Sequence, residues 1–219
     1  MGDRYAVIGN PIEHSKSPQI HAAFAAQTDQ DLEYGRLLGT PGRFAEEVRQ
    51  FFADGGKGLN VTVPFKGQAW DLADDLSRRA RLARAVNTLI LLPGGNIRGD
   101  NTDGAGLVRD LQANHGAELG GKRLLQLGAG GAARGVLGPL CECGPASIAV
   151  ANRTPARAEQ LVAELAELGP LEGMGLERLA GHQFDLIINA TAAGLLDRVP
   201  DIPDALLNPG GCCYDMMYG

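Results

Sequence analysis

A glycine-rich segment near the middle of the chain has the residue types and spacing that bind the phosphates of a dinucleotide. Gly128-Ala129-Gly130-Gly131-Ala132-Ala133 fits the pattern G-x-G-x-x-[G/A]. In such a turn the first glycine permits a tight bend and the second lets the backbone approach a pyrophosphate, while the small third residue permits close packing of helix on strand. An apolar strand pattern precedes the motif and a helix pattern comes after it, which is the context that it needs. The segment therefore predicts a dinucleotide cofactor.

The end of the next predicted strand indicates which dinucleotide binds. A site for NAD usually has Asp or Glu there, about 20 residues beyond the first glycine, to accept a hydrogen bond from the ribose 2′-hydroxyl. This chain has Asn152-Arg153-Thr154 instead. A carboxylate would repel a 2′-phosphate, whereas Arg153 can pair with it, and Arg157 in the next helix can add a second cation. The pattern predicts NADP rather than NAD.

Polar patches at turns or strand ends mark the first half of the chain. Ligands of open α/β sheets collect beyond the carboxyl ends of strands, so polar residues there indicate a binding site. Ser17-Pro18 also predicts the start of a helix, with Ser17 as its N-cap. The patches are His14-Ser15-Lys16-Ser17-Pro18, Asn60-Val61-Thr62-Val63-Pro64-Phe65-Lys66 and Asn101-Thr102-Asp103-Gly104.

Together with Ala85-Val86-Asn87-Thr88, these patches resemble the shikimate dehydrogenase family. The resemblance covers essentially the whole chain, in order, and the combination of motifs is highly specific. It implies the NADPH-dependent reduction of 3-dehydroshikimate to shikimate, a step in aromatic amino-acid biosynthesis. The further motifs that carry it are Ile8-Gly9-Asn10-Pro11, residues 128–133, Asn152-Arg153-Thr154, Ile188-Asn189-Ala190-Thr191 and Tyr214-Asp215-Met216-Met217-Tyr218.

The resemblance implies roles for individual residues. Lys66 and Asp103 occupy the family's catalytic positions, and Thr191 and Met216 would lie along the nicotinamide. The implied substrate contacts, of which the two serines would bind a carboxylate, are Ser15, Ser17, Asn60, Thr62, Asn87 and Tyr218. The cofactor contacts expected from motif and resemblance together are Gly128, Ala129, Gly130, Gly131, Ala132, Asn152, Arg153, Thr154, Arg157, Thr191 and Met216.

These residue types suit the reduction of a ketone. Hydride that arrives at the carbonyl carbon builds negative charge on the oxygen, which must be stabilised and then protonated. Protonated Lys66 can do both, while Asp103 holds the ammonium group and accepts a hydrogen bond from a neighbouring substrate hydroxyl. We expect His14 and His21 to be structural.

Three other functions stay open. A quinate/shikimate dehydrogenase of broader specificity is the nearest, although Ser15 and Arg153 favour shikimate and NADP. Family members usually continue beyond the Tyr-Asp-Met-x-Tyr motif with a glycine-leucine-glycine turn, a substrate-binding glutamine and further helices. Because this chain stops at Gly219, we expect either a truncated form, which could be a non-catalytic binding protein for NADP or shikimate, or a longer natural chain. The Asn-Arg-Thr motif also occurs in glutamyl-tRNA reductases, which the first-half motifs disfavour.

Composition limits the class of protein. A net charge of −6 argues against a general nucleic-acid binder. No apolar run approaches the roughly 20 residues that span a bilayer, and no signal-peptide pattern is visible, so we expect a cytoplasmic protein. The cysteines, spaced as C-x-C and C-C, do not match a zinc site, and we predict no metal. A homodimer stays open.

Strand and helix signals alternate throughout, which predicts an α/β fold of parallel strands joined by helical crossovers. We place a boundary between residues 102 and 103, which gives an N-terminal α/β substrate-binding and catalytic domain and a Rossmann-type NADP-binding domain with a parallel sheet. Expected strands are residues 5–8, 32–38, 58–63, 88–92, 123–127, 147–151, 184–190 and 212–216. Expected helices are residues 19–27, 43–53, 68–76, 78–85, 103–115, 132–143 and 154–168, the last capped by Thr154.

Overall fold

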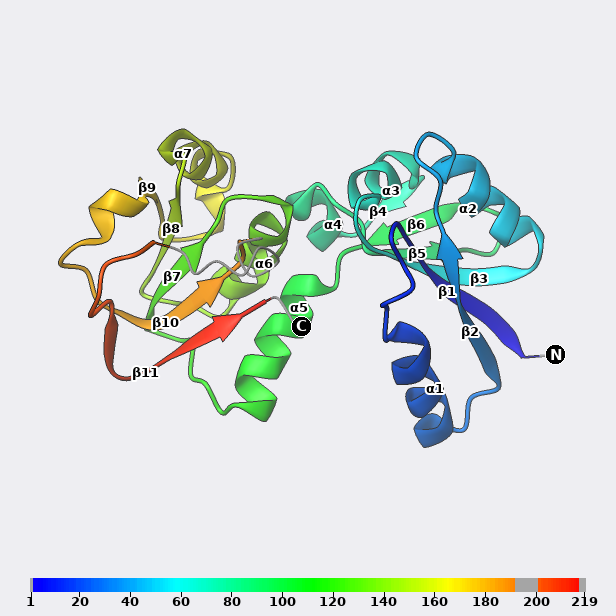
Figure 1. The fold of residues 1–219 in the computed structure, drawn as a ribbon, viewed down its shortest axis with the longest axis horizontal. Helices are drawn as coiled ribbons and strands as arrows, with labels where there is room; N and C mark the ends of the chain where they lie inside the picture. The colour runs from blue at the N-terminus through cyan, green and yellow to red at the C-terminus, as the bar shows by residue number, and fades with distance from the viewer. Residues whose placement is uncertain (1, 192–200, 217–219) are drawn as a thin grey trace. The chain divides into compact units, whose positions relative to one another are not determined.

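The computed structural model describes residues 2–191 and 201–216, and the chain forms two compact units, Met1–Thr102 and Asp103–Gly219 (Figure 1). We call them the N-terminal unit and the C-terminal unit and describe each by itself. Both combine strands and helices, which confirms the predicted α/β class. None of the helices in the described residues is long and apolar enough to cross a membrane.

The N-terminal unit, over residues 2–102, contains a six-stranded sheet in the order β2-β1-β3-β5-β6-β4. The strands β1, β2 and β3 pair in parallel, whereas β5 pairs antiparallel with both β3 and β6. Its elements are β1 (Asp3–Gly9), α1 (Ser17–Thr28), β2 (Leu32–Leu38), α2 (Phe44–Ala53), β3 (Gly56–Val61), α3 (Lys66–Leu72), β4 (Asp75–Leu76), α4 (Arg78–Ala83), β5 (Thr88–Leu91) and β6 (Ile97–Asp100).

The expectation of parallel strands throughout is wrong for this unit, because β5 and β6 form a hairpin. Pro93-Gly94-Gly95, which directly follows the expected strand over residues 88–92, is the tip of that hairpin. The Leu92 amide donates to the Asn96 carbonyl across it at 2.8 Å. A turn this short can join only antiparallel neighbours. The helix expected over residues 68–76 ends at Leu72, and β4 then pairs in parallel with β6.

The core of the N-terminal unit lies between α2 and the sheet. The spacing of the apolar residues in α2 places Phe44, Val48, Phe51 and Phe52 on one buried face of the helix. There they pack with residues of β1 and β3. Burying a side chain of this size stabilises the fold by about 1.5–3 kcal/mol relative to leaving it exposed. This packing fixes the carboxyl ends of β1 and β3, from which the first two polar patches continue.

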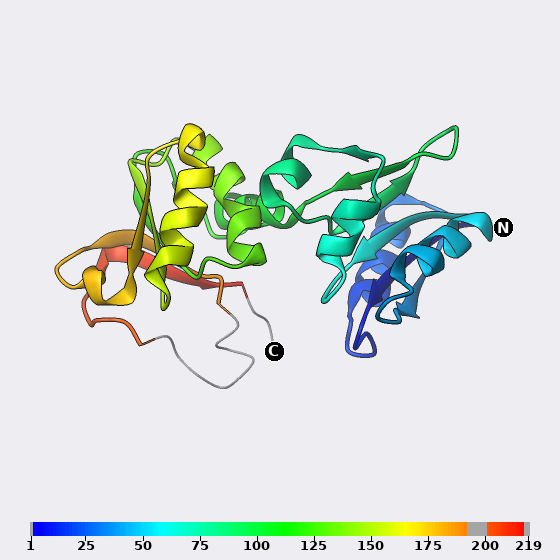
Figure 2. The ribbon, with the colours of Figure 1, turned by 90° about the horizontal axis from the view of Figure 1, so that it is seen from above.

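The C-terminal unit has a five-stranded sheet in the described residues, in the order β11-β10-β7-β8-β9, and every pair is parallel. This arrangement confirms the predicted Rossmann-type sheet. Figure 2 shows α7 as a yellow helix, which packs against β8 and β9. The elements are α5 (Asp103–Arg109), a π-helix (Asp110–Asn114), β7 (Arg123–Leu127), α6 (Gly131–Glu142), β8 (Ser147–Asn152), α7 (Pro155–Glu164), two 3₁₀ turns (Ala166–Leu168 and Leu176–Leu179), β9 (Leu171–Gly175), β10 (Phe184–Asn189) and β11 (Leu207–Asp215).

Two strands of the C-terminal unit depart from expectation. The sequence signals did not predict β9, which lies at the sheet edge and contains two glycines, Gly173 and Gly175. Glycine is depleted in strands because it has no side chain to pack. The strand β11 begins at Leu207 rather than at Cys212 and pairs with β10 through an irregular register.

Candidate functional site

The turn after β1 brings two serine hydroxyls together. Ser15 Oγ donates to Ser17 Oγ at 3.1 Å, and the Ser17 amide donates back to Ser15 Oγ at 3.3 Å. The prediction that Ser17 is an N-cap is wrong, because α1 begins at Ser17 and Lys16 occupies the cap position. The hydroxyl of Ser17 is therefore not consumed by capping, and the two serine hydroxyls lie together at the start of α1.

An arginine and an aromatic stack support this serine turn. Arg36 of β2 donates through Nε (3.1 Å) and Nη2 (2.5 Å) to the Ser15 carbonyl. The His21 ring lies 4.0 Å from the Tyr34 ring in a parallel stack, and its Nδ1 lies 2.9 Å from the Ser17 carbonyl oxygen. Burial raises the pKa of Tyr34 to about 12, against an opposing hydrogen bond with Ser17. The contacts of His21 suit the structural role expected of it.

Sequence reasoning missed Tyr34 and Arg36. They are two residues apart in β2, so their side chains leave the same face of the strand, and β2 is the parallel neighbour of the strand that leads into the serine turn. The predicted strand over residues 32–38 already placed the two side chains on one face. Their position beside the serine turn could be inferred only once the pairing of β1 with β2 was known.

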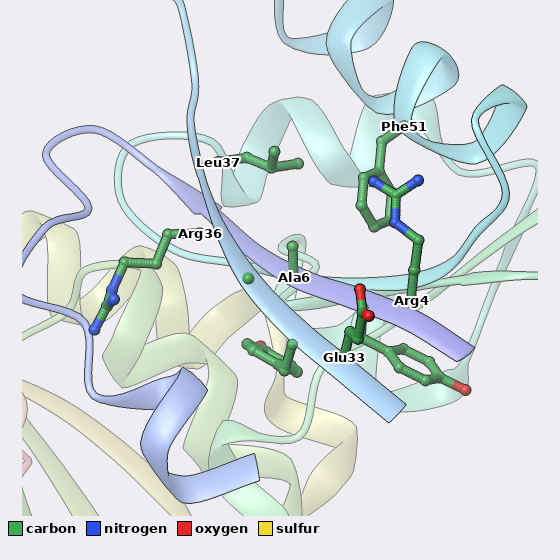
Figure 3. Close-up of a pocket in the computed structure, with 9 residues that line it drawn as sticks. Arg4, Ala6, Glu33, Arg36, Leu37 and Phe51 are labelled. Carbon is green, nitrogen blue, oxygen red and sulfur yellow. The ribbon is translucent and has the colours of Figure 1, made fainter. Parts of the chain in front are cut away.

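A hollow of about 310 Å³ lies along the β1–β2 edge, with Arg4, Glu33, Leu37 and Phe51 among its lining residues (Figure 3). Arg36 and Leu37 are adjacent in β2 and extend in opposite directions (Figure 3). Arg36 can therefore hold the serine turn while its neighbour faces the core. None of the predicted site residues lines this hollow.

A second cluster joins β3, β5 and the turn after β6. The Tyr34 hydroxyl donates to Asn60 Oδ1 at 2.6 Å, and Asn60 Nδ2 donates to Thr88 Oγ1 at 3.3 Å. Asn87 Oδ1 accepts from the Thr88 hydroxyl (2.8 Å) and the Thr102 amide (3.1 Å), and its Nδ2 donates to Thr102 Oγ1 at 2.9 Å. These bonds connect the predicted substrate residues Asn60 and Asn87 in one network.

Lys66 and Thr62 come after the end of β3. The Thr62 amide donates to the Ile8 carbonyl at 3.0 Å, and a Cβ at Gly9 would lie 2.4 Å from Thr62 Cγ2, so only glycine permits this approach. Lys66 is the first residue of α3, and its carbonyl accepts from the Val86 amide at 2.9 Å. Lys66 is half-buried. Its backbone is thus fixed beside the segment that carries Asn87.

Asp103 is the first residue of α5 and directly follows Thr102, which bonds to Asn87. The approach to this position is held by Asp100, whose Oδ1 accepts from the Asn101 amide at 2.7 Å and from the Ser77 hydroxyl. Arg79 forms an ion pair with Asp100. Asn101 is buried, and its Nδ2 donates to the Ala85 carbonyl at 3.1 Å.

We expect Asp100 to stabilise the fold less at acid pH than at neutral pH. Partial burial of Asp100 raises its pKa, but hydrogen bonds from Arg79, Ser77 and the Asn101 amide, with the Arg79 charge, outweigh burial and hold the pKa below its ordinary value. A lowered folded-state pKa stabilises the fold above the unfolded pKa of about 3.9, and this contribution disappears as pH falls through the folded pKa. Asp100→Asn should therefore lower the free energy of unfolding near neutral pH and lose that deficit in acid. Urea unfolding followed by the fluorescence of Trp70, the chain's one tryptophan, measures the free energy of unfolding of the N-terminal unit at several pH values. A loss of stability in Asp100→Asn that does not vary with pH would contradict the prediction.

The glycine-rich turn combines a positive φ at its first glycine with open space at the two glycines that come after it. Gly128 has φ +102°, and a Cβ there would lie 3.1 Å from the Ala190 carbonyl oxygen. A Cβ at Gly130 or Gly131 would meet nothing within 4 Å, so packing does not demand glycine at those positions. The twelve-residue helix α6 begins at Gly131 without a side-chain cap. Open space beside Gly130 and Gly131, together with helix amide groups that no side chain caps, suits a phosphate of the predicted cofactor.

The end of β8 presents the predicted 2′-phosphate site. Arg153 and Arg157 are exposed, and in the described residues their guanidinium groups have no carboxylate partner. Asn152 Nδ2 donates to the Thr154 carbonyl at 2.9 Å, which closes the turn between β8 and α7. Thr154 occupies the N-cap position of α7, as predicted, with Pro155 as the first helical residue, but its side chain makes no capping bond. Two exposed cations at this position suit a dianionic phosphate.

The two residues predicted along the nicotinamide come from neighbouring strand ends. Thr191 lies just after β10 and Met216 just after β11, and both are half-buried. Tyr218, predicted as a substrate contact, lies outside the described residues. Ala129 and Ala132 lie in and just after the glycine turn, as expected from their positions in the chain. The described residues contain no group of three side chains suited to hold a metal ion.

The C-terminal unit has a parallel sheet, a glycine turn before a helix that no side chain caps, and two arginines after the next strand. These features define the class of Rossmann-type dinucleotide-binding proteins. Residues 7–89 match the family described as "Shikimate dehydrogenase substrate binding domain". Residues 110–196 match the one described as "Shikimate / quinate 5-dehydrogenase". The chain belongs to the shikimate dehydrogenase family, which confirms the resemblance.

Similar proteins agree with this membership. The "Shikimate dehydrogenase (NADP(+))" of Thioalkalivibrio sulfidiphilus is 57% identical over 99% of this chain and 80% of its own length. That of Methylococcus capsulatus is 58% identical over 99% of this chain and 77% of its own. The crystal structure of shikimate 5-dehydrogenase from Thermus thermophilus, in complex with NADP(H) and shikimate, has a TM-score of 0.84 at 32% identity and covers 97% of this chain and 78% of that one.

Proposed function

We propose that this chain catalyses the NADPH-dependent, reversible reduction of 3-dehydroshikimate to shikimate in aromatic amino-acid biosynthesis. The observation that carries the proposal is 57% identity to an NADP-dependent shikimate dehydrogenase over 99% of the chain. The hydrogen-bonded cluster around Asn60 and Asn87 and the glycine turn support it from the structure. In this proposal residues 1–102 bind the substrate and residues 103–219 bind NADP.

The serine turn would bind the substrate carboxylate. The two hydroxyls lie 3.1 Å apart, so both can reach one carboxylate group. Arg36 adds positive charge directly behind the Ser15 carbonyl, which favours an anion in front of the turn. The cluster of Asn60, Thr62 and Asn87 offers amide and hydroxyl groups that match the hydroxyls of a cyclohexene ring. Tyr218 remains a predicted substrate contact.

Lys66 and Asp103 would carry the acid–base chemistry. NADPH, when bound, supplies the hydride that reaches the ketone carbon. The ammonium group of Lys66 stabilises the charge that develops on the carbonyl oxygen and gives that oxygen its proton. Asp103 holds the ammonium group and accepts a hydrogen bond from a neighbouring substrate hydroxyl. In the oxidative direction the same lysine takes the proton back.

The cofactor would be held by the C-terminal unit. The glycine turn at residues 128–132 would receive the pyrophosphate, and Asn152, Arg153, Thr154 and Arg157 would surround the 2′-phosphate. Thr191 and Met216 would lie along the nicotinamide. The open space at Gly130 and the two exposed guanidinium groups support this arrangement.

Location and assembly are further proposals. All four cysteines are free thiols, and Cys212 and Cys213 are exposed, which suits a reducing cytoplasm. A homodimer is supported by the outer edge of β2, which has no neighbouring strand in the described part of the chain. Ile20 and Phe24 of α1, which are 46% and 54% exposed, support it as well.

The decisive experiment follows NADPH absorbance after 3-dehydroshikimate is added to this chain. A second arm uses the chain extended by the additional segment of its relatives, since it spans about 80% of their length. We expect NADPH consumption that depends on 3-dehydroshikimate, with weaker turnover of quinate in the oxidative direction. Faster quinate than shikimate oxidation would favour the broader quinate/shikimate activity, and no turnover by either chain would contradict the proposal.

Removing the Ser15 hydroxyl should affect the substrate alone. Ser15→Ala deletes one charge-assisted hydrogen bond to the carboxylate, so we expect shikimate affinity to fall by about tenfold. NADP affinity, measured separately by calorimetry, should not change. Ser147→Ala, at the start of β8, is the matched control and should alter neither affinity. Weaker NADP binding with intact shikimate binding would reverse the assignment of the two units.

A further inference from the structure

Asn189, the last residue of β10, bonds to both residues that are predicted to lie along the nicotinamide. Its Oδ1 accepts from the Thr191 hydroxyl at 2.7 Å and from the Thr191 amide at 3.1 Å. Its backbone carbonyl accepts from the Met216 amide at 3.0 Å. Its Nδ2 donates to Asp215 Oδ2 at 2.9 Å. One residue therefore bonds to both predicted nicotinamide contacts.

These bonds are needed because β10 and β11 stop pairing at this point. Asn189 and Asp215 are the last register partners of the two strands. In the described residues, the bond from the Met216 amide to the Asn189 carbonyl is the last backbone bond between the two segments, and none holds Thr191 to the end of β11. Thr191 is β-branched, and its hydroxyl donates a hydrogen bond to Asn189 Oδ1. Both features restrict the rotamer of the Thr191 side chain. The bond to Asp215 and the bond to the Met216 amide hold the end of β11 against the same residue.

We propose that Asn189 is a positioning residue that sets the nicotinamide side of the cofactor site, because its side chain holds Thr191 against Asp215, the neighbour of Met216 at the end of β11. The inference rests on the proposed function for the identity of the cofactor. The adenosine half of the site should be unaffected, because the glycine turn is held by other bonds. The Gly128 amide donates to the Ala151 carbonyl at 2.8 Å, and the Ala190 amide donates to the Leu127 carbonyl at 2.9 Å. Both are backbone bonds that survive a change at the Asn189 side chain.

Two ligands distinguish the halves of the site. NADPH spans the whole site, whereas 2′,5′-ADP carries the adenosine and 2′-phosphate but no nicotinamide. For Asn189→Ala we expect NADPH affinity to fall by about tenfold and 2′,5′-ADP affinity to change by less than about twofold. We also expect kcat to fall by about 10- to 100-fold, because a small misplacement of the reacting groups slows transfer strongly.

The chain offers a matched control at the other end of the same strand pair. Asn208 Nδ2 donates to Asp185 Oδ1 at 2.9 Å and so also links β11 to β10. Asn208→Ala removes an equivalent bond and should cost similar stability in thermal unfolding, while both affinities and kcat stay near those of the parent chain. A merely structural role for Asn189 would make the two variants alike.

A reversed pair tests the hydrogen bonds themselves. Asn189→Asp alone places two carboxylates together and should weaken NADPH binding. Combined with Asp215→Asn, it restores a donor at residue 215 and an acceptor at residue 189, so NADPH affinity should recover. Equal losses of NADPH and 2′,5′-ADP affinity in Asn189→Ala, or unchanged affinity for both, would overturn the inference. Because these are binding measurements, they hold even if 3-dehydroshikimate is not turned over, a result that would reject only the proposed function.

Discussion

Replacing Lys66 with alanine should lower kcat by at least about 10²–10⁴, because the variant loses a general acid and the charge that stabilises the oxyanion. Affinity for shikimate should fall far less, since the serine turn and Asn87 still hold the ring. The fold should survive, because the contact of Lys66 with Val86 is made by its backbone carbonyl. Stopped-flow NADPH absorbance and calorimetric titration with shikimate measure the two effects separately.

Asp103→Ala should be nearly as damaging, and the double variant should be little worse than the worse single one. Residues that act as one unit give strongly non-additive losses. Asp103 also begins α5, where a carboxylate interacts favourably with the helix dipole. Asp103→Asn keeps the size of the side chain but removes its charge, so comparing it with Asp103→Ala separates an effect on folding from an effect on catalysis. Losses that multiply would mean that Lys66 and Asp103 work separately. A Lys66→Ala chain that keeps its kcat and loses only affinity would make Lys66 a binding group.

The second large effect concerns cofactor choice. Arg153→Ala should raise the KM for NADPH by about 10- to 100-fold, which corresponds to the loss of a hydrogen bond between charged groups. The KM for NADH should change little, because NADH has no 2′-phosphate. Arg157→Ala should show a smaller effect of the same sign. Steady-state kinetics with both cofactors give the comparison.

Arg123 provides the control for this experiment. It is an exposed arginine of the same unit and the first residue of β7, paired with Ser147 at the opposite end of β8 from Arg153. Arg123→Ala removes the same charge away from the predicted phosphate, and both KM values should stay unchanged. If Arg153→Ala weakened NADPH and NADH equally, Arg153 would be structural and the predicted specificity would be wrong.

The fold was most predictable where hydrophobic pattern and turn residues agreed. The apolar run before Gly128 and the glycine turn itself predicted β7 and α6 to within a residue, because a parallel strand buried on both faces leaves a continuous apolar signal. β6 was missed, since its four residues include Arg98, Gly99 and Asp100 and carry little apolar signal. β5 was predicted, but its antiparallel pairing depends on a hairpin that only the structure reveals.

The residues of the proposed site lie in sequence motifs, whereas the contacts that support them could not be predicted from the sequence. The serines, Asn60 and Asn87 lie in recognisable patches, and the structure places them in the N-terminal unit with defined hydrogen bonds. Tyr34 and Arg36 lie in an ordinary edge strand, and their contacts depend on the pairing of β1 with β2. Asn189 lay inside a predicted motif, but its bonds to Asp215 and Met216 depend on how β10 pairs with β11.

Transfer of deuterium tests the central claim most directly. The chain is incubated with 3-dehydroshikimate and NADPH deuterated on the transferring face of the nicotinamide, and the product is identified by mass spectrometry and NMR. We predict shikimate with one deuterium on the carbon that bears the new hydroxyl, and no labelled product from the Lys66→Ala chain on the same time scale. Unlabelled shikimate, or no shikimate from either this chain or its extended form while NADPH still binds, would contradict the account.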